Sequence, residues 1–150
     1  MTSEISRSIP RPDGVAKAGG GAAYIADIPY ETALTARFYR STFSRGRVTA
    51  VNLPELPEGY FVVDHTDVPA HNHVALIKTD WPAFAVDEIR YNGQIMLIVA
   101  GPDPREVDRL LKEITVDYEP IPPAVSLEDG VACVGGAMHG ADNIFADLSI

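Results

Sequence analysis

Hydrophobic residues form the most regular pattern of the chain between residues 95 and 118. Ile95 to Ala100 are an unbroken apolar run, long enough for a strand buried on both faces and far too short to cross a membrane. Apolar residues then recur at the spacing of one helix face, in Val107, Leu110, Leu111 and Ile114. The residues from Thr115 to Tyr118 favour a strand that ends before Pro120. This segment therefore predicts a β-α-β unit.

The start of the predicted helix carries residues that cap helices. Asp103 offers a carboxylate to the free backbone amides, and Pro104 suits the first helical position because it has no N–H to leave unpaired. Glu106 completes a capping box. The apolar spacing and the capping residues agree on one clear helix at about residues 103–114.

Shorter runs of alternating residues predict the other strands. The most regular one sets Leu34, Ala36 and Phe38 on one face and polar residues or tyrosine on the other, as in a strand with one buried face. Pro54 and Pro57 exclude a regular helix before Gly59. The strands expected before residue 95 are 23–28, 34–39, 47–53, 60–63 and, less regularly, 74–78.

The two ends of the chain differ from its middle. Residues 1–21 are polar and rich in Gly and Pro, which predicts an arm without regular structure. Glycines also loosen the segment 128–150, yet its last residues stay apolar and patterned up to Ile150. Because a finished domain usually ends in polar residues, we expect the chain to continue into a further domain.

Composition narrows the classes of partner. The 150 residues carry 12 basic and 21 acidic side chains and a net charge of −9, which disfavours nucleic acid or an anionic membrane. Cys133 is the only cysteine, so an internal disulfide is excluded. Residues 1–8 lack the apolar segment of a signal peptide, and a cytoplasmic location is expected.

Two clusters of residues are candidates for binding: three histidines for a metal ion, and four arginines for an anion. His65, His71 and His73 lie near Asp64 and Asp67, a set that suits a metal ion, but histidines in a polar loop are commonly just solvated, and no metal site is predicted. The arginines have two interpretations. They are an exposed edge balancing an acidic protein, or they make the chain a free-standing module that binds a small anion or acidic peptide, since guanidinium groups suit phosphate and carboxylate. They are Arg37, Arg40, Arg45 and Arg47.

No set of residues predicts a catalytic centre. The chain has no Gly-x-Ser-x-Gly nucleophile motif, and Cys133, between valine and alanine, is interpreted as a small hydrophobic residue. Gln94 follows the Asn92-Gly93 turn and is a weak candidate for binding a cofactor. A structural role at that corner is the favoured interpretation.

Several segments, in their order and spacing, resemble the molybdopterin-binding large subunit of the xanthine dehydrogenase and aldehyde oxidase family. The resemblance covers about residues 10–127. It rests on Arg11 to Lys17, Gly21 to Ile28, the Leu34–Ser41 and Gly46–Val48 pair, and most specifically on the segments Arg90-Tyr-Asn-Gly-Gln94 and Val116-Asp-Tyr-Glu-Pro-Ile-Pro122.

The resemblance implies a fold and a role. The fold would be an amino-terminal α/β hammerhead of the α+β class, with a mixed sheet, one clear helix and a projecting hairpin. It implies an arm at 1–21, the hammerhead at 22–127, and a linker at 128–150 leading into a molybdopterin-binding domain.

The whole enzymes hydroxylate purines, nitrogen heterocycles or aldehydes, and pass electrons to iron–sulfur clusters and FAD in partner subunits or domains. Their catalytic motifs have no counterpart here, so this chain alone is expected to lack the cofactor and activity. Two departures, at Ser41 to Gly46 and in the Pro54–Pro57 segment, resemble anaerobic, clostridial-type purine or nicotinate hydroxylases.

Overall fold

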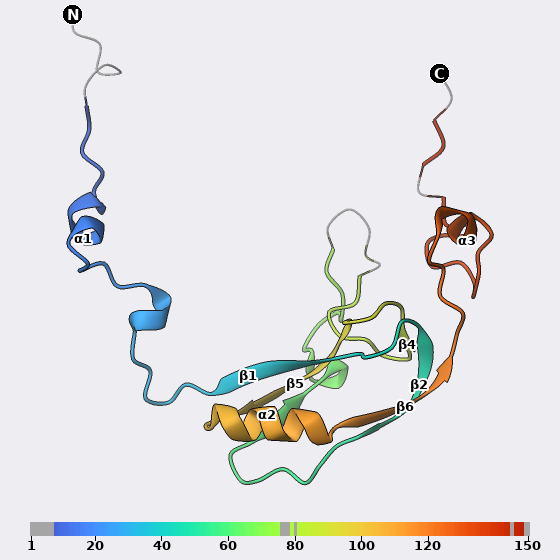
Figure 1. Ribbon diagram of the computed structural model, residues 1–150, viewed down its shortest axis with the longest axis horizontal. Helices are drawn as coiled ribbons and strands as arrows, with labels where there is room; N and C mark the ends of the chain where they lie inside the picture. Colours follow the sequence, from blue (N-terminus) through green and yellow to red (C-terminus); the bar gives the residue numbers. More distant parts are fainter. Residues whose placement is uncertain (1–7, 76–78, 80, 145, 149–150) are drawn as a thin grey trace, which may run out of the picture. The chain divides into compact units, whose positions relative to one another are not determined.

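The computed structural model describes residues 8–75, 79, 81–144 and 146–148, in two compact units, Met1–Ala33 and Leu34–Ile150 (Figure 1). Most of the strand expected at 74–78 lies outside the described residues. The first unit holds α1 (Gly14–Ala18) and the 3-10 turn η2 (Ile25–Asp27). No helix among the described residues has the length and apolar character needed to span a bilayer.

The second unit contains two antiparallel sheets of three strands each. In the first, β5 (Ile95–Gly101) lies between β1 (Thr35–Arg40) and β3 (Phe61–Val63). In the second, β2 (Gly46–Asn52) lies between β4 (Glu88–Ile89) and β6 (Thr115–Pro120). The predicted α+β hammerhead is confirmed, but its strands form two antiparallel sheets where a mixed sheet was expected. Because β1 and β3 occupy both edges of β5, β6 cannot pair beside it and pairs with β2.

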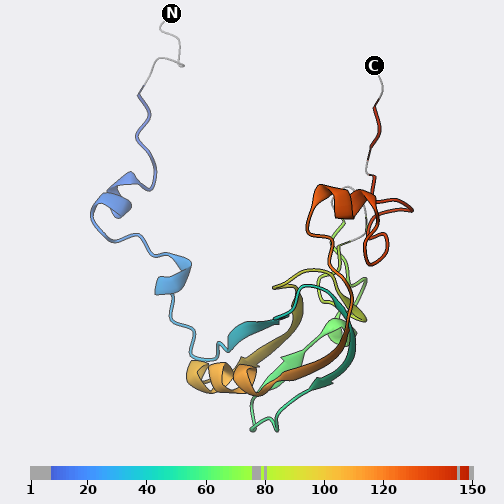
Figure 2. The ribbon, with the colours of Figure 1, turned by 45° about the vertical axis from the view of Figure 1, so that its right-hand side comes forward.

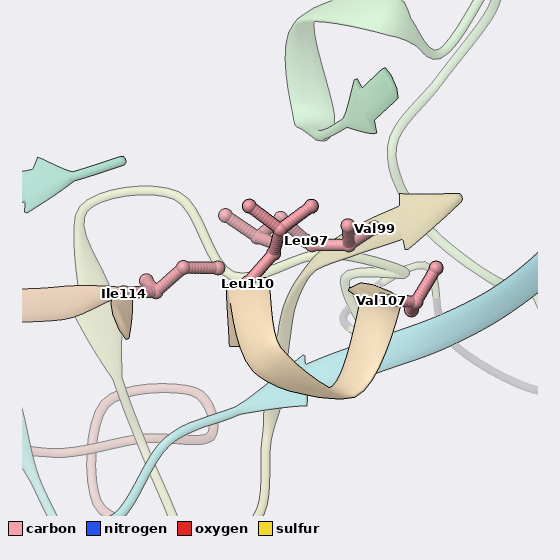
Figure 3. Close-up of a cluster of buried hydrophobic side chains, with 5 residues drawn as sticks. All are labelled: Leu97, Val99, Val107, Leu110 and Ile114. Carbon is pink, nitrogen blue, oxygen red and sulfur yellow. The ribbon is translucent and has the colours of Figure 1, made fainter. Parts of the chain in front are cut away.

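Helix α2 (Pro104–Glu113) connects the two sheets and covers one face of the first. It starts at the predicted residues, with the Asp103 side chain accepting a hydrogen bond from the Arg105 amide at 2.9 Å. The capping box expected at Glu106 is wrong, because that carboxylate accepts from the Arg109 side chain instead. The helix lies along β1 and β5 in both views (Figure 2). Figure 3 shows the Leu110 side chain directed from the helix toward Leu97 on β5. The buried cluster consists of Leu97, Val99, Val107, Leu110 and Ile114.

The helix covers the face of β1 opposite to the one predicted. Tyr39 packs against the core, and Arg37 at the margin of the same face pairs with Asp108 of α2 at 3.1 Å. Phe38 stays half exposed. The alternation of β1 correctly predicts a strand with one buried face, but that face is the one with Tyr39, whose ring packs against the core.

A second cluster connects the two sheets. Ala85, Ile89 and Met96 are buried there, with the partly buried Tyr39, Phe43, Val48 and Val116 packed around them. The rings of Phe43 and Tyr118 stack with centroids 3.6 Å apart. Gly46 allows this packing, because a Cβ there would lie 2.7 Å from the Tyr118 ring.

Three segments differ from their predictions. The arm at residues 1–21 contains α1, where Lys17 pairs with Asp13 at 2.7 Å across one helical turn. The strand expected at 23–28 is the turn η2, closed by the Asp27 carboxylate on the Tyr24 amide. The segment 128–150 begins inside α3 (Leu127–Val131), whose Ser126 cap accepts from the Asp129 amide. In each segment, ion pairs or hydrogen bonds between neighbouring residues stabilise a short helix or turn, which the pattern of hydrophobic residues does not reveal.

Gly101 at the end of β5 is expected to be intolerant of a side chain. A Cβ there would overlap the Tyr60 ring, which packs against the core. We expect Gly101→Ala to lower the free energy of unfolding by about 1–3 kcal/mol, the usual cost of overpacking. Urea denaturation measures the change. Gly130→Ala is the control, because its Cβ would meet no atom within 4 Å, and an equal loss in both variants would contradict the expectation.

Candidate functional site

Gln94 lies at the entrance of β5 and is buried, with 2% of its surface exposed. Its side-chain oxygen accepts a hydrogen bond from the Arg90 amide at 2.8 Å, and its backbone oxygen accepts one from the Ser41 amide at 2.9 Å. The bond from Arg90 fixes which end of the side chain is oxygen, because an N–H must meet an acceptor. Gln94 therefore has the structural role favoured from the sequence, and its role toward a cofactor stays a prediction.

The buried Ser41 hydroxyl closes the same corner. It donates to the Tyr91 carbonyl at 3.0 Å and accepts from the Gly93 amide at 3.1 Å. Gly93 has φ of +87°, a conformation that favours glycine, so Asn92-Gly93 makes the predicted turn. The end of β1 and the start of β5 are thus fixed to each other at this corner, which orients Gln94.

A small pocket of about 190 Å³ lies beside this corner, and we call it the Gln94 pocket. Its walls combine three separate segments of the second unit: Trp81 and Pro82; Arg90, Tyr91 and Gln94; Met138 and His139. Trp81 and Tyr91 are each about half exposed at its rim. Sequence reasoning found Gln94 but missed the pocket, because residues 82 and 138 are brought together only by the fold.

The four arginines do not form one anion site. Arg45 is buried and donates to Glu88 at 2.9 Å and to the Val134 carbonyl at 3.2 Å. Arg37 pairs with Asp108, and Arg40 donates to the Gly93 carbonyl at 2.9 Å. Of the four, Arg47 alone has neither an ion pair nor a side-chain hydrogen bond within the described chain. The arrangement disfavours the anion-binding module and shows Arg45 as a structural residue, which its place in a polar turn did not indicate.

The histidine segment forms a capped turn and a ring contact. The rings of His71 and His73 stack with centroids 5.2 Å apart. Asp64 caps the 3-10 turn η3 (His65–Asp67), accepting from both the amide and the hydroxyl of Thr66 at 2.7 Å. Within the described residues, no group of three His, Cys, Asp or Glu side chains is placed to hold a metal ion.

The cap at Asp64 gives a pH-dependent prediction. The Thr66 hydroxyl, followed by its amide, lowers the pKa of Asp64 below its usual value. A lowered carboxyl pKa stabilises the fold above the unfolded pKa of about 3.9, and the stabilisation is lost as pH falls through the folded pKa. We expect Thr66→Val to cost less than about 1 kcal/mol at pH 6, because the site is partly exposed, and progressively less as the pH falls through the folded pKa of Asp64.

An NMR titration of the Asp64 carboxyl checks this directly. In Thr66→Val the midpoint should rise toward the ordinary value, whereas Thr49→Val, at an exposed position of β2, should leave it in place. A midpoint that is equal in all three proteins would show that the hydroxyl does not set this pKa.

Comparison with known proteins gives matches over most of the chain. The family described as "Aldehyde oxidase and xanthine dehydrogenase, a/b hammerhead domain" matches residues 19–122. The nicotinate dehydrogenase large molybdopterin subunit of Eubacterium barkeri is 28% identical over 143 residues, covering 93% of this chain and 34% of that protein. A nicotinate hydroxylase of Emericella nidulans is 28% identical over 131 residues, covering 85% of this chain and 10% of that protein. The chain therefore spans about a third or less of these relatives.

Solved structures share the fold at lower identity. The aldehyde oxidoreductase of Desulfovibrio desulfuricans superposes with a TM-score of 0.74 at 22% identity, over 93% of this chain and 17% of that one. The CO dehydrogenase of Oligotropha carboxidovorans gives a TM-score of 0.67 at 20% identity, over 82% and 16%. Both contain the same arrangement of elements within a much longer chain.

Proposed function

Because this chain belongs to the aldehyde oxidase and xanthine dehydrogenase a/b hammerhead family, we propose that it serves as the scaffold and docking domain of a molybdenum hydroxylase. The observation that carries the proposal is the family match over residues 19–122, together with the 28% identity to a large molybdopterin subunit. In this role the chain supplies surface and support to the rest of the enzyme, and the reaction takes place elsewhere.

The described residues do not fit a molybdopterin. Cofactor sites usually enclose about 300–1,000 Å³, and the Gln94 pocket of about 190 Å³ falls below that range. Two other pockets, of about 380 and 320 Å³, are large enough, but each is lined by two carboxylates and a single arginine, Asp87 and Glu88 with Arg90 in one and Glu55 and Glu113 with Arg109 in the other, a balance that disfavours a phosphate-bearing group. We therefore place the cofactor in the remaining part of the large subunit, and the iron–sulfur clusters and FAD in partner subunits or domains.

The names of the relatives support a proposal for the substrate class. Two of them are a nicotinate dehydrogenase and a nicotinate hydroxylase, which favours a pyridine-type nitrogen heterocycle over a purine or an aldehyde. The enzyme would be an assembly in the cytoplasm. The chain would contribute its arm, hammerhead and following linker to that assembly, and no group in it would contact the substrate.

Co-expression of this chain with the molybdopterin-binding part of the large subunit, produced as a separate polypeptide, tests the docking role. We expect the two to form a stoichiometric complex in analytical ultracentrifugation. Reconstituted with the iron–sulfur and FAD partners and given an electron acceptor for the two electrons released, that complex should hydroxylate nicotinate. The chain alone should show no hydroxylation of nicotinate, xanthine or benzaldehyde. Two polypeptides that sediment independently at micromolar concentration would contradict the docking role.

A further inference from the structure

The Gln94 pocket is a feature of the described surface that the scaffold role leaves without an explanation. It combines an apolar wall, two half-exposed aromatic side chains and one buried amide. Its volume of about 190 Å³ is below the about 300–1,000 Å³ of sites for small molecules. A space of this size suits one apolar side chain.

The amide of Gln94 adds a directional group to the pocket. Its oxygen is held by the Arg90 amide, which leaves the NH₂ end as the available donor. Within the part of the chain that the structure describes, this nitrogen makes no hydrogen bond, and no side-chain polar atom is both fully buried and unpaired. Since Gln94 lines the pocket and is otherwise buried, the nitrogen reaches open space there. Open to solvent there, this N–H is a donor that a carbonyl oxygen of a binding partner can accept.

We propose that the Gln94 pocket is an anchoring socket for the molybdopterin-binding polypeptide, which inserts one apolar side chain between Trp81 and Tyr91. The neighbouring backbone carbonyl of that polypeptide accepts the free N–H of Gln94. This inference rests on the proposed function, because it identifies where the docking partner binds.

Two observations favour a polypeptide as the occupant. The relatives are about three to ten times longer than the part matched here, so most of each relative lies outside this domain and must pack against it somewhere. Half-exposed tryptophan and tyrosine around a small pocket are also typical of the centre of protein interfaces, where a few aromatic residues carry most of the binding energy.

Two variants remove the two parts of the socket. Trp81→Ala removes an exposed wall, and Gln94→Glu keeps the oxygen that meets the Arg90 amide but replaces the donor with a carboxylate. Isothermal titration of each variant with the molybdopterin-binding polypeptide should show Kd raised about tenfold or more. Circular dichroism and thermal melting confirm that each variant is folded.

Matched controls separate the socket from general effects. Asn92→Asp introduces the same charge two positions from Gln94 at an exposed residue outside the pocket, and Tyr30→Ala removes an exposed aromatic ring from the other unit. Both should bind within about twofold of the wild type. Equal weakening by Asn92→Asp and Gln94→Glu would overturn the proposal, because charge alone would then explain the loss.

The remaining outcomes are also decisive. If the wild type binds and either Trp81→Ala or Gln94→Glu binds as tightly as it does, the socket is wrong while the docking role stands. If the wild type does not bind, both proposals fail.

Trp81 is the only tryptophan of the chain, so 5-fluorotryptophan labelling gives one ¹⁹F resonance. That resonance should shift on binding of the polypeptide, and an unchanged resonance in the complex would overturn the socket.

Discussion

Replacing Leu110 with aspartate is expected to unfold the hammerhead. Leu110 is fully buried between α2 and β5, where a carboxylate would have neither water nor a cationic partner. The cost of an unpaired buried charge, added to the lost apolar contacts, is comparable with the whole stability of about 5–15 kcal/mol of a domain this size. Circular dichroism and an amide NMR spectrum should show an unfolded second unit.

Two further variants calibrate that result. Leu110→Ala should remain folded but lose about 2–5 kcal/mol, because a cavity replaces the side chain. Lys112→Asp introduces the same residue on the exposed side of α2 and should change stability by less than about 1 kcal/mol. A Leu110→Asp protein melting within about two degrees of the wild type would show that α2 does not cover this sheet.

Replacing Arg45 with methionine is expected to produce the second largest loss. Methionine keeps an apolar side chain in the buried space but removes the bonds to Glu88 and to the Val134 carbonyl. We expect the free energy of unfolding to fall by about 2–3 kcal/mol. This is less than for a wholly buried ion pair, because the Glu88 side chain is 34% exposed to solvent. Urea denaturation at neutral pH measures it.

The same variant discriminates a structural arginine from an anion site. Adding Glu88→Leu to Arg45→Met should recover part of the loss, because the carboxylate is then no longer left without its partner. Arg47→Met should be close to neutral, and titration of the wild type with inorganic phosphate should give no saturable heat. A loss below about 0.5 kcal/mol in Arg45→Met, with saturable phosphate binding, would restore the anion-binding interpretation.

The sequence was informative where local chemistry and burial agree. The apolar run of β5, the spacing of Leu110 with its neighbours, and the Asp103 cap all appear in the structure at nearly the predicted residues. The division into two sheets was not predictable in the same way, since periodicity describes which residues are buried and says little about which strands pair. The face of β1 was misjudged because Arg37 and Tyr39 combine polar tips with apolar bodies.

The candidate site shows the same limit. Gln94 stood out because it follows an Asn-Gly turn, and its hydrogen bonds explain its place there. Arg45 looked like part of a charged edge, whereas contacts with residues 43 and 89 positions away bury it. The Gln94 pocket brings Met138 and Trp81 to one site, and the sequence carries no signal for that.

The molybdenum content of the purified chain tests the central claim most directly. The chain should be produced in a host that synthesises molybdopterin, both alone and together with the molybdopterin-binding polypeptide, and analysed by inductively coupled plasma mass spectrometry. We expect the complex to contain stoichiometric molybdenum and the chain alone to contain none above the background of an unrelated protein. Stoichiometric molybdenum in the chain alone would contradict its assignment as a scaffold and docking domain that lacks the cofactor.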